Sequence, residues 1–179
     1  MKKKLVILLL IVYGFSFIAP SVRADYVLPY PSYMPGNSIY RLSRIFDRLK
    51  YYWYWGNIAS VKYHLALSDK YLVEAKTLFE YKQYLLASDA LAGSDKQLVD
   101  IPTLLQQGKK EREDMSQLRL LVREGMDAHM AVINTLKSQL PKEFIWKPEK
   151  VSETTIHIDE ILTSSHEIRQ QVSDEVTGL

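Results

Sequence analysis

The sequence predicts an all-α protein, an antiparallel bundle of about five helices that follows an extended proline-rich segment. Apolar residues recur at alternating steps of three and four over most of the chain, which is the spacing of a helix face that packs lengthwise on its neighbours. No stretch shows the strict alternation of a half-buried strand. Three prolines fall within residues 29–35 and exclude a helix there.

Residues 1–24 have the features of a secretory signal peptide. Lysines precede an uncharged apolar run over residues 5–18, and the small residues Val22 and Ala24 occupy the positions that signal peptidase reads. The run is shorter than the about 20 apolar residues of a membrane-spanning helix. We expect cleavage after Ala24 and export across the cytoplasmic membrane, to the periplasm, the cell surface or the medium, with no transmembrane segment left. An uncleaved N-terminal anchor is the alternative.

Cleavage would change the charge of the protein. The chain has 23 basic and 21 acidic residues, and four of the basic ones belong to the signal, so 19 basic residues and a net charge of −2 remain. No basic surplus attracts nucleic acid, which we exclude as a partner, and attraction to anionic lipid is weakened equally. The absence of cysteine excludes disulfides and thiolate metal sites.

The remaining chain suits a single domain with one core. We assign residues 25–37 to a Pro-rich strap, 38–140 to a helical bundle domain, and 141–179 to a linker and a C-terminal helix packed on the bundle. Because prolines restrict their own φ and the conformation of the preceding residue, the strap should be stiff and extended. It either closes one end of the core or docks a partner segment, as other proline-rich stretches do.

The first helix should begin near residue 38 and end near Gly56. Its apolar stripe is Ile39, Leu42, Ile45, Phe46, Leu49, Tyr52 and Trp53. The second helix carries the stripe Ile58, Val61, Leu65, Ser68, Leu72, Ala75 and Phe79. The third carries Tyr84, Ala87, Leu91, Ser94, Leu98, Ile101 and Leu105, with Pro102 inside the pattern. We expect a kink or a short restart of the helix at Pro102 and favour the kink, because the stripe continues in phase beyond the proline.

A fourth helix is expected over residues 110–139, ended by Pro141. Its stripe is Met115, Leu118, Val122, Met126, His129, Ile133 and Leu136. Residues 141–150 should form a linker that docks Phe144, Ile145 and Trp146 on the bundle. The last helix is expected over residues 152–175, with the stripe Ile158, Ile161, Ser165, Ile168 and Val172.

The first half of the chain resembles an exported bacterial all-helical family of unknown function, whose members open with a Leu-Pro-Tyr-Pro-Gly, Pro-Gly, Leu-Tyr motif. The matching residues are Leu28-Pro29-Tyr30-Pro31, Pro35-Gly36, Tyr40 and Asp47, then His64-Leu65, Ser68-Asp69-Lys70, Leu72 and Glu74-Ala75. Ser32 departs from the usual glycine and Ser68 from the usual alanine. The resemblance covers roughly residues 26–140 and implies a helical fold, with no established activity to carry over.

His129 is the most informative polar residue, because it lies near the centre of the apolar stripe formed by Val122, Met126 and Ile133. A buried imidazole needs hydrogen-bond partners and tends to lose its proton. His129, Met126 and Val122 could therefore line a ligand pocket, with the imidazole as general base, ligand or pH-sensitive group. The alternative is a structural histidine satisfied by a neighbouring hydroxyl or carboxylate.

The stretch "KYYWYWGN" places five aromatic residues in succession, so on a helix they point in all directions and some cannot face the core. They could pack on Trp146, form a dimer contact, bind glycan rings or lie at a membrane surface. The candidate interaction surface is Tyr30, Tyr33, Tyr51, Tyr54 and Trp55.

Known enzyme signatures are missing: there is no Gly-x-Ser-x-Gly, no His-Glu-x-x-His, no glycine-rich phosphate loop and no cysteine nucleophile. Glu153, His157 and Glu160 form a stripe that we interpret as a solvated face, because helical di-metal sites use Glu-x-x-His pairs, which are absent. We predict no enzymatic activity, no metal site and no cofactor. The sequence favours an interaction or structural module of the cell envelope, bound to an envelope protein or to itself. The alternative is a small-molecule or metal-binding bundle around His129.

Overall fold

The computed structural model describes residues 26–31, 34–35, 38–148 and 152–179, with the side chains of residues 38, 41, 48 and 51 left undescribed. Its elements are α2 (Ser38–Lys50), η1 (Tyr51–Trp53), α3 (Asn57–Glu80), α4 (Tyr84–Leu98), α5 (Ile101–Lys110), α6 (Ser116–Gln139), β1 (Glu143–Trp146), β2 (Thr154–His157) and α7 (Ile158–Gly178). The prediction of an all-α bundle is confirmed, and α4 with α5 forms the third predicted helix.

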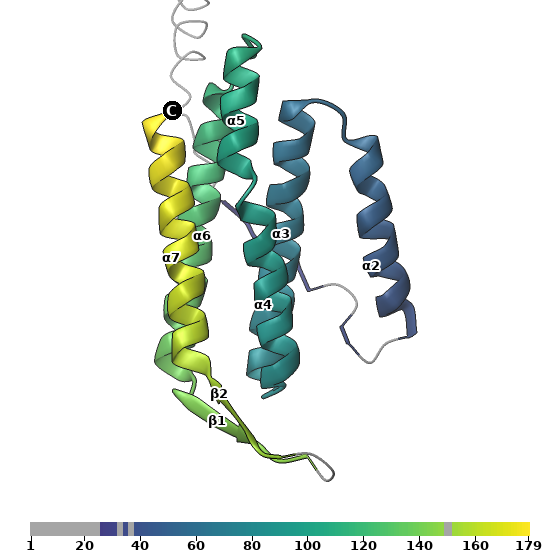
Figure 1. Ribbon diagram of the computed structural model, residues 1–179, viewed down its shortest axis with the longest axis vertical. Helices are drawn as coiled ribbons and strands as arrows, with labels where there is room; N and C mark the ends of the chain where they lie inside the picture. Colours follow the sequence, from purple (N-terminus) through teal and green to yellow (C-terminus); the bar gives the residue numbers. More distant parts are fainter. Residues whose placement is uncertain (1–25, 32–33, 36–37, 149–151) are drawn as a thin grey trace, which may run out of the picture.

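The body of the molecule is an antiparallel arrangement of α3, α4 continued by α5, α6 and α7 (Figure 1). The small β1–β2 sheet lies at one end of this body, and the C-terminus lies at the other (Figure 1). Helix α2 lies outside the body, beside α3 (Figure 1). The chain turns from η1 into α3 at Gly56, whose φ of +86° is a conformation that side chains with a Cβ rarely adopt.

The prediction that Pro102 kinks a continuous helix is wrong. Helix α4 ends at Leu98, and α5 begins at Ile101 with Pro102 in its first turn. The first turn of a helix is where proline fits, because its missing N–H needs no partner there. Val99 and Asp100 keep right-handed helical dihedral angles, so the apolar stripe stays in phase across the break.

The expectation of a strand-free linker is also wrong. Strands β1 and β2 pair antiparallel, with Phe144 opposite Ile156 and Trp146 opposite Thr154. The β-branched and aromatic residues on both strands favour extended backbone, which delays the start of the last helix from residue 152 to Ile158. Phe144 packs on the core, its ring centroid 4.7 Å from that of Tyr84, while Ile145 and Trp146 remain exposed.

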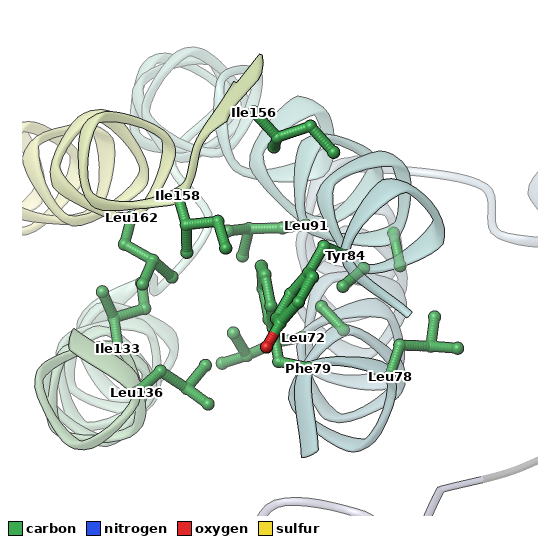
Figure 2. Packing of buried hydrophobic residues seen from close by; sticks show 13 residues of the cluster. Leu72, Leu78, Phe79, Tyr84, Leu91, Ile133, Leu136, Ile156, Ile158 and Leu162 are labelled. Carbon is green, nitrogen blue, oxygen red and sulfur yellow. The ribbon is translucent and has the colours of Figure 1, made fainter. Parts of the chain in front are cut away.

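The buried apolar side chains form two main clusters along the body. The hairpin-end core lies nearer the β1–β2 sheet, and Figure 2 shows its side chains converging from several helices. It contains Leu72, Ala75, Leu78, Phe79, Tyr84, Ala87, Ala90, Leu91, Ile133, Leu136, Ile156, Ile158 and Leu162. The C-terminal-end core contains Val61, Leu65, Leu98, Ile101, Leu105, Met115, Leu118, Val122, Met126, Val172 and Val176.

The described part of the strap contacts the body. Tyr26 packs on the C-terminal-end core beside Gly125, where an added Cβ would come within 3.1 Å of the tyrosine ring. Leu28 and Met34 pack on the hairpin-end core, whereas Tyr30 is 95% exposed. Within the described ranges, no helix combines the length and the apolar character needed to cross a membrane.

Candidate functional site

A layer of polar side chains separates the two cores. Helices α3, α4, α6 and α7 each contribute residues to this layer. On each helix these residues lie between those that pack in one core and those that pack in the other. The members are Ser68 and Asp69 from α3, Ser94 and Asp95 from α4, His129 from α6, and Ser165 and Arg169 from α7. Ser68, Ser94, His129 and Ser165 belong to the stripes identified in the sequence, while Asp69, Asp95 and Arg169 do not.

Arg169 is the centre of one half of the layer, and its side chain is completely buried. Its Nη1 donates to Asp95 Oδ1 at 2.6 Å and to Ser165 Oγ at 2.6 Å, while its Nη2 donates to Ser94 Oγ at 2.8 Å. Burial lowers the pKa of Arg169, against the opposing charge of Asp95. Ser94 also donates to the backbone carbonyl of Ser68 at 2.9 Å, which links α7 to α3 through α4.

His129 is the centre of the other half. Its Nε2 lies 2.7 Å from Asp69 Oδ1, and the hydroxyl of Tyr26 donates to Asp69 Oδ2 at 2.6 Å. Burial lowers the pKa of His129 despite the hydrogen bond to Asp69, so the imidazole is neutral near pH 7 and donates from Nε2. Burial and the charge of Asp69 raise the pKa of Tyr26, which keeps its hydroxyl protonated.

The geometry of this layer is that of a structural network. His129, Val122 and Met126 are completely buried, and the two apolar side chains belong to the packed C-terminal-end core. The polar groups of the layer point at one another, although His129 Nδ1 and Arg169 Nε have no hydrogen-bond partner among the described residues. Nor do those residues bring together three histidine or acidic side chains that could hold a metal ion.

The second notable region is α2, which meets the body through a polar inner face. Glu74 on α3 accepts from the Tyr40 hydroxyl at 2.6 Å and from Arg44 Nη2 at 3.3 Å. Hydrogen bonding to Tyr40 and the charge of Glu74 raise the pKa of Arg44, although burial alone would lower it. The guanidinium also lies over the Tyr71 ring, 3.8 Å from its centroid, which is a cation–π contact.

Asp47 makes the other inner-face contacts. Its carboxylate accepts from Lys70 Nζ, which also donates to Ser43 Oγ at 3.0 Å. Its backbone carbonyl accepts from the buried Tyr63 hydroxyl at 2.5 Å. Polar groups thus attach α2 to α3, and no described apolar residue of α2 is among those that pack on the two cores.

The apolar stripe of α2 points away from the body, which corrects the expectation that it packs in the bundle. We call Ile39, Leu42, Ile45, Phe46 and Leu49 the outer face of α2; each is between 45% and 54% exposed. The physical reason is that α3 offers α2 the charged groups of Lys70 and Glu74. The Tyr63 hydroxyl and the Tyr71 ring also bind polar groups of α2, so the polar side of α2 faces inward.

The aromatic turn, residues 51–55, follows directly. Trp53 and Trp55 are 76% and 84% exposed, while Tyr54 is less exposed and its ring centroid lies 5.0 Å from that of Tyr63. Of the predicted interaction residues, Tyr30, Tyr54 and Trp55 are thus at the surface, Tyr54 with the smallest exposed fraction. Tyr33 lies outside the described residues and Tyr51 is described by its backbone only.

A groove of about 450 Å³ lies between the aromatic turn and the body. Its lining includes Arg44, Tyr52, Tyr63, Tyr71 and Lys96. The groove therefore combines rings with cationic groups, but Arg44 already binds Glu74 and Tyr71.

The inner face of α2 and the role of Arg169 were not predicted from the sequence. A signal for the inner face exists, because Tyr40, Ser43, Arg44 and Asp47 share the helix side opposite the apolar stripe. Arg169 carries no comparable signal, since an arginine one turn after Ser165 is usually exposed. No protein-family model, curated protein or solved structure matches the chain, and the family resemblance stays a prediction.

Proposed function

We propose that the protein is an exported, non-catalytic interaction module of the bacterial cell envelope, and that it docks through the outer face of α2 and the aromatic turn. The observation that carries the proposal is the outward orientation of five large apolar side chains on one short helix. Scattered surface hydrophobic residues are normal, but a contiguous apolar stripe marks an interaction surface. The signal-like residues 1–24 support export.

The attachment of α2 supports the same proposal. The polar inner face holds the helix in one orientation through Glu74 and Lys70. This fixed orientation keeps the apolar stripe on the outer surface of the molecule. The other buried polar groups, in the layer around His129 and Arg169, bind one another and offer no comparable contact to a partner.

Site-specific photo-crosslinking in intact producing cells tests this function. A photoreactive residue at position 45, on the outer face, should form covalent adducts with other components of the envelope. The matched control is position 120, because Leu120 is an exposed apolar residue of α6, a helix separated from α2 by α3 (Figure 1). Adducts at position 45 that are absent at position 120 support the proposal. Equal yields at both positions, or none at position 45, contradict it.

A further inference from the structure

We propose that the surface bound by the outer face of α2 is an anionic lipid bilayer, with α2 lying in the headgroup region between the lipid and the body. This inference rests on the proposed function and names its partner. Three properties of α2 carry it: the shape of the apolar face, the distribution of charge along the chain, and the position of the tryptophans.

The apolar face has the shape that an interfacial helix needs. At 100° per residue, residues 39, 42, 45, 46 and 49 cover an arc of roughly 120°, and the inner-face residues occupy the opposite side. The helix is 13 residues long, far too short to span a bilayer. A short helix with one apolar side and a polar remainder binds in the plane of the interface, with its apolar side about 5–10 Å deep.

The charge of α2 complements an anionic surface. The helix contains Arg41, Arg44, Arg48 and Lys50 against the single acid Asp47, a net charge of +3. Since the chain after residue 24 has a net charge of −2, everything outside α2 sums to −5. Positions 41 and 48 border one edge of the apolar arc and position 50 borders the other. The weak attraction to anionic lipid expected from the whole chain therefore does not hold for α2.

The aromatic turn supplies interfacial anchors at the end of α2. Tryptophan and tyrosine prefer the boundary between lipid and water, because their rings are apolar and carry one polar group. Trp53 and Trp55 are the most exposed tryptophans described, and Tyr52 beside them is also exposed. Trp53 and Trp55 follow directly on the C-terminal end of α2.

These features favour lipid over a second copy of the chain. A self-associated pair would bring two helices of charge +3 together along their apolar faces, and like charges at such a border repel. An anionic bilayer supplies the opposite charge at both borders and hydrocarbon beneath the apolar arc. On such a bilayer the exposed tryptophans would lie at the boundary between lipid and water.

Vesicle binding tests the inference, with protein recovered from an exporting host and shown by intact mass to begin at Asp25. The vesicles are phosphatidylglycerol mixed with phosphatidylethanolamine, or phosphatidylcholine alone. Wild-type protein should sediment with the anionic vesicles and shift its tryptophan emission to shorter wavelength. Ile45→Glu should weaken this binding by about tenfold or more, because it places a charge in the apolar arc. Leu120→Glu on α6 should leave it unchanged.

A second pair of variants tests the electrostatic contribution to vesicle binding. Lys50→Gln should weaken binding to anionic vesicles about fivefold and leave binding to phosphatidylcholine unchanged. Lys142→Gln, outside α2, is the matched control. About 1 M salt, where the Debye length is about 3 Å, should weaken the wild-type interaction in the same direction. Should Ile45→Glu fail to fold, these measurements still decide the inference.

Other outcomes separate the inference from the proposed function. If the wild-type protein binds neither vesicle type but forms a dimer, and Ile45→Glu dissociates that dimer, the lipid inference is overturned. The proposal of an interaction module would still stand. Vesicle binding that Ile45→Glu and Lys50→Gln leave unchanged also overturns it. If lipid binding and self-association are both absent and position 45 gives no adduct in cells, the proposed function fails as well.

Discussion

Helices α2 and α3 carry the same apolar pattern but use it in opposite ways. On α3, Val61, Leu65 and Leu72 are buried in the cores, whereas on α2 the equivalent stripe is about half exposed. The difference comes from the neighbours. Helix α3 faces apolar stripes on α4 and α6, while α2 faces the outer side of α3. That side binds polar groups of α2 through Lys70, Glu74, the Tyr63 hydroxyl and the Tyr71 ring. Periodicity therefore defines an apolar face, and the partner surface decides whether that face is turned inward.

The largest difference in stability between the body and α2 is expected when an arginine is removed from each. Arg169→Ala should lower the free energy of unfolding by about 3–5 kcal/mol, because it leaves Asp95 without its charged partner inside the body. Arg44→Ala removes the ion pair between α2 and the buried Glu74 and should cost less, about 1–3 kcal/mol, because Arg44 itself is partly exposed and Tyr40 still donates to Glu74. Urea denaturation of both variants measures the two changes in the free energy of unfolding. Similar costs would mean that α2 is as integral to the fold as α7.

Apolar truncations compare the two stripes directly. Leu72→Ala removes a completely buried side chain and should cost about 2–5 kcal/mol. Leu42→Ala removes the same atoms from the outer face of α2 and should change stability by less than about 0.5 kcal/mol. Thermal unfolding of the two variants is the measurement. A large cost for Leu42→Ala would place the outer face of α2 inside the fold.

Acid should destabilise the body through His129. Because burial lowers the pKa of His129 in the folded state, the unfolded state binds a proton more readily. This contribution to stability is complete above the unfolded pKa of about 6.5 and is lost as the pH falls below it, by at most about 1.4 kcal/mol per pH unit. His129→Gln retains a donor for Asp69 and should flatten this part of the pH profile. An unchanged profile would contradict a neutral His129.

The last expected effect is confined to α2. Asp47→Asn weakens the contact with Lys70 and should make α2 open more easily, by about 1 kcal/mol. Hydrogen exchange should then be faster in α2 while the amides of α3 keep their protection. Asp127→Asn, on the exposed side of α6, is the control. Equal acceleration in α2 and α3 would show that they open together.

Much of the body follows from local sequence. The stripes of α3, α4 and α6 were predicted residue by residue, because a helix period of 3.6 residues places i, i+3 and i+4 on one face. The polar members Ser68, Ser94 and His129 were visible in these stripes, and Ser165 was visible in the predicted stripe of the last helix. What they contact was not, since Asp69, Asp95 and Arg169 come from three different helices.

Sequence alone determined the helical class, the buried faces of α3, α4 and α6 and the turn at Gly56, because these depend on residues close together in the chain. Tertiary structure decided the closure of the polar layer, the β1–β2 sheet and the outward orientation of α2. Each of these requires groups far apart in sequence to meet, as Asp47 meets Lys70 and Asp95 meets Arg169. Such pairings depend on how the helices are placed in space, which the pattern within any one helix does not contain.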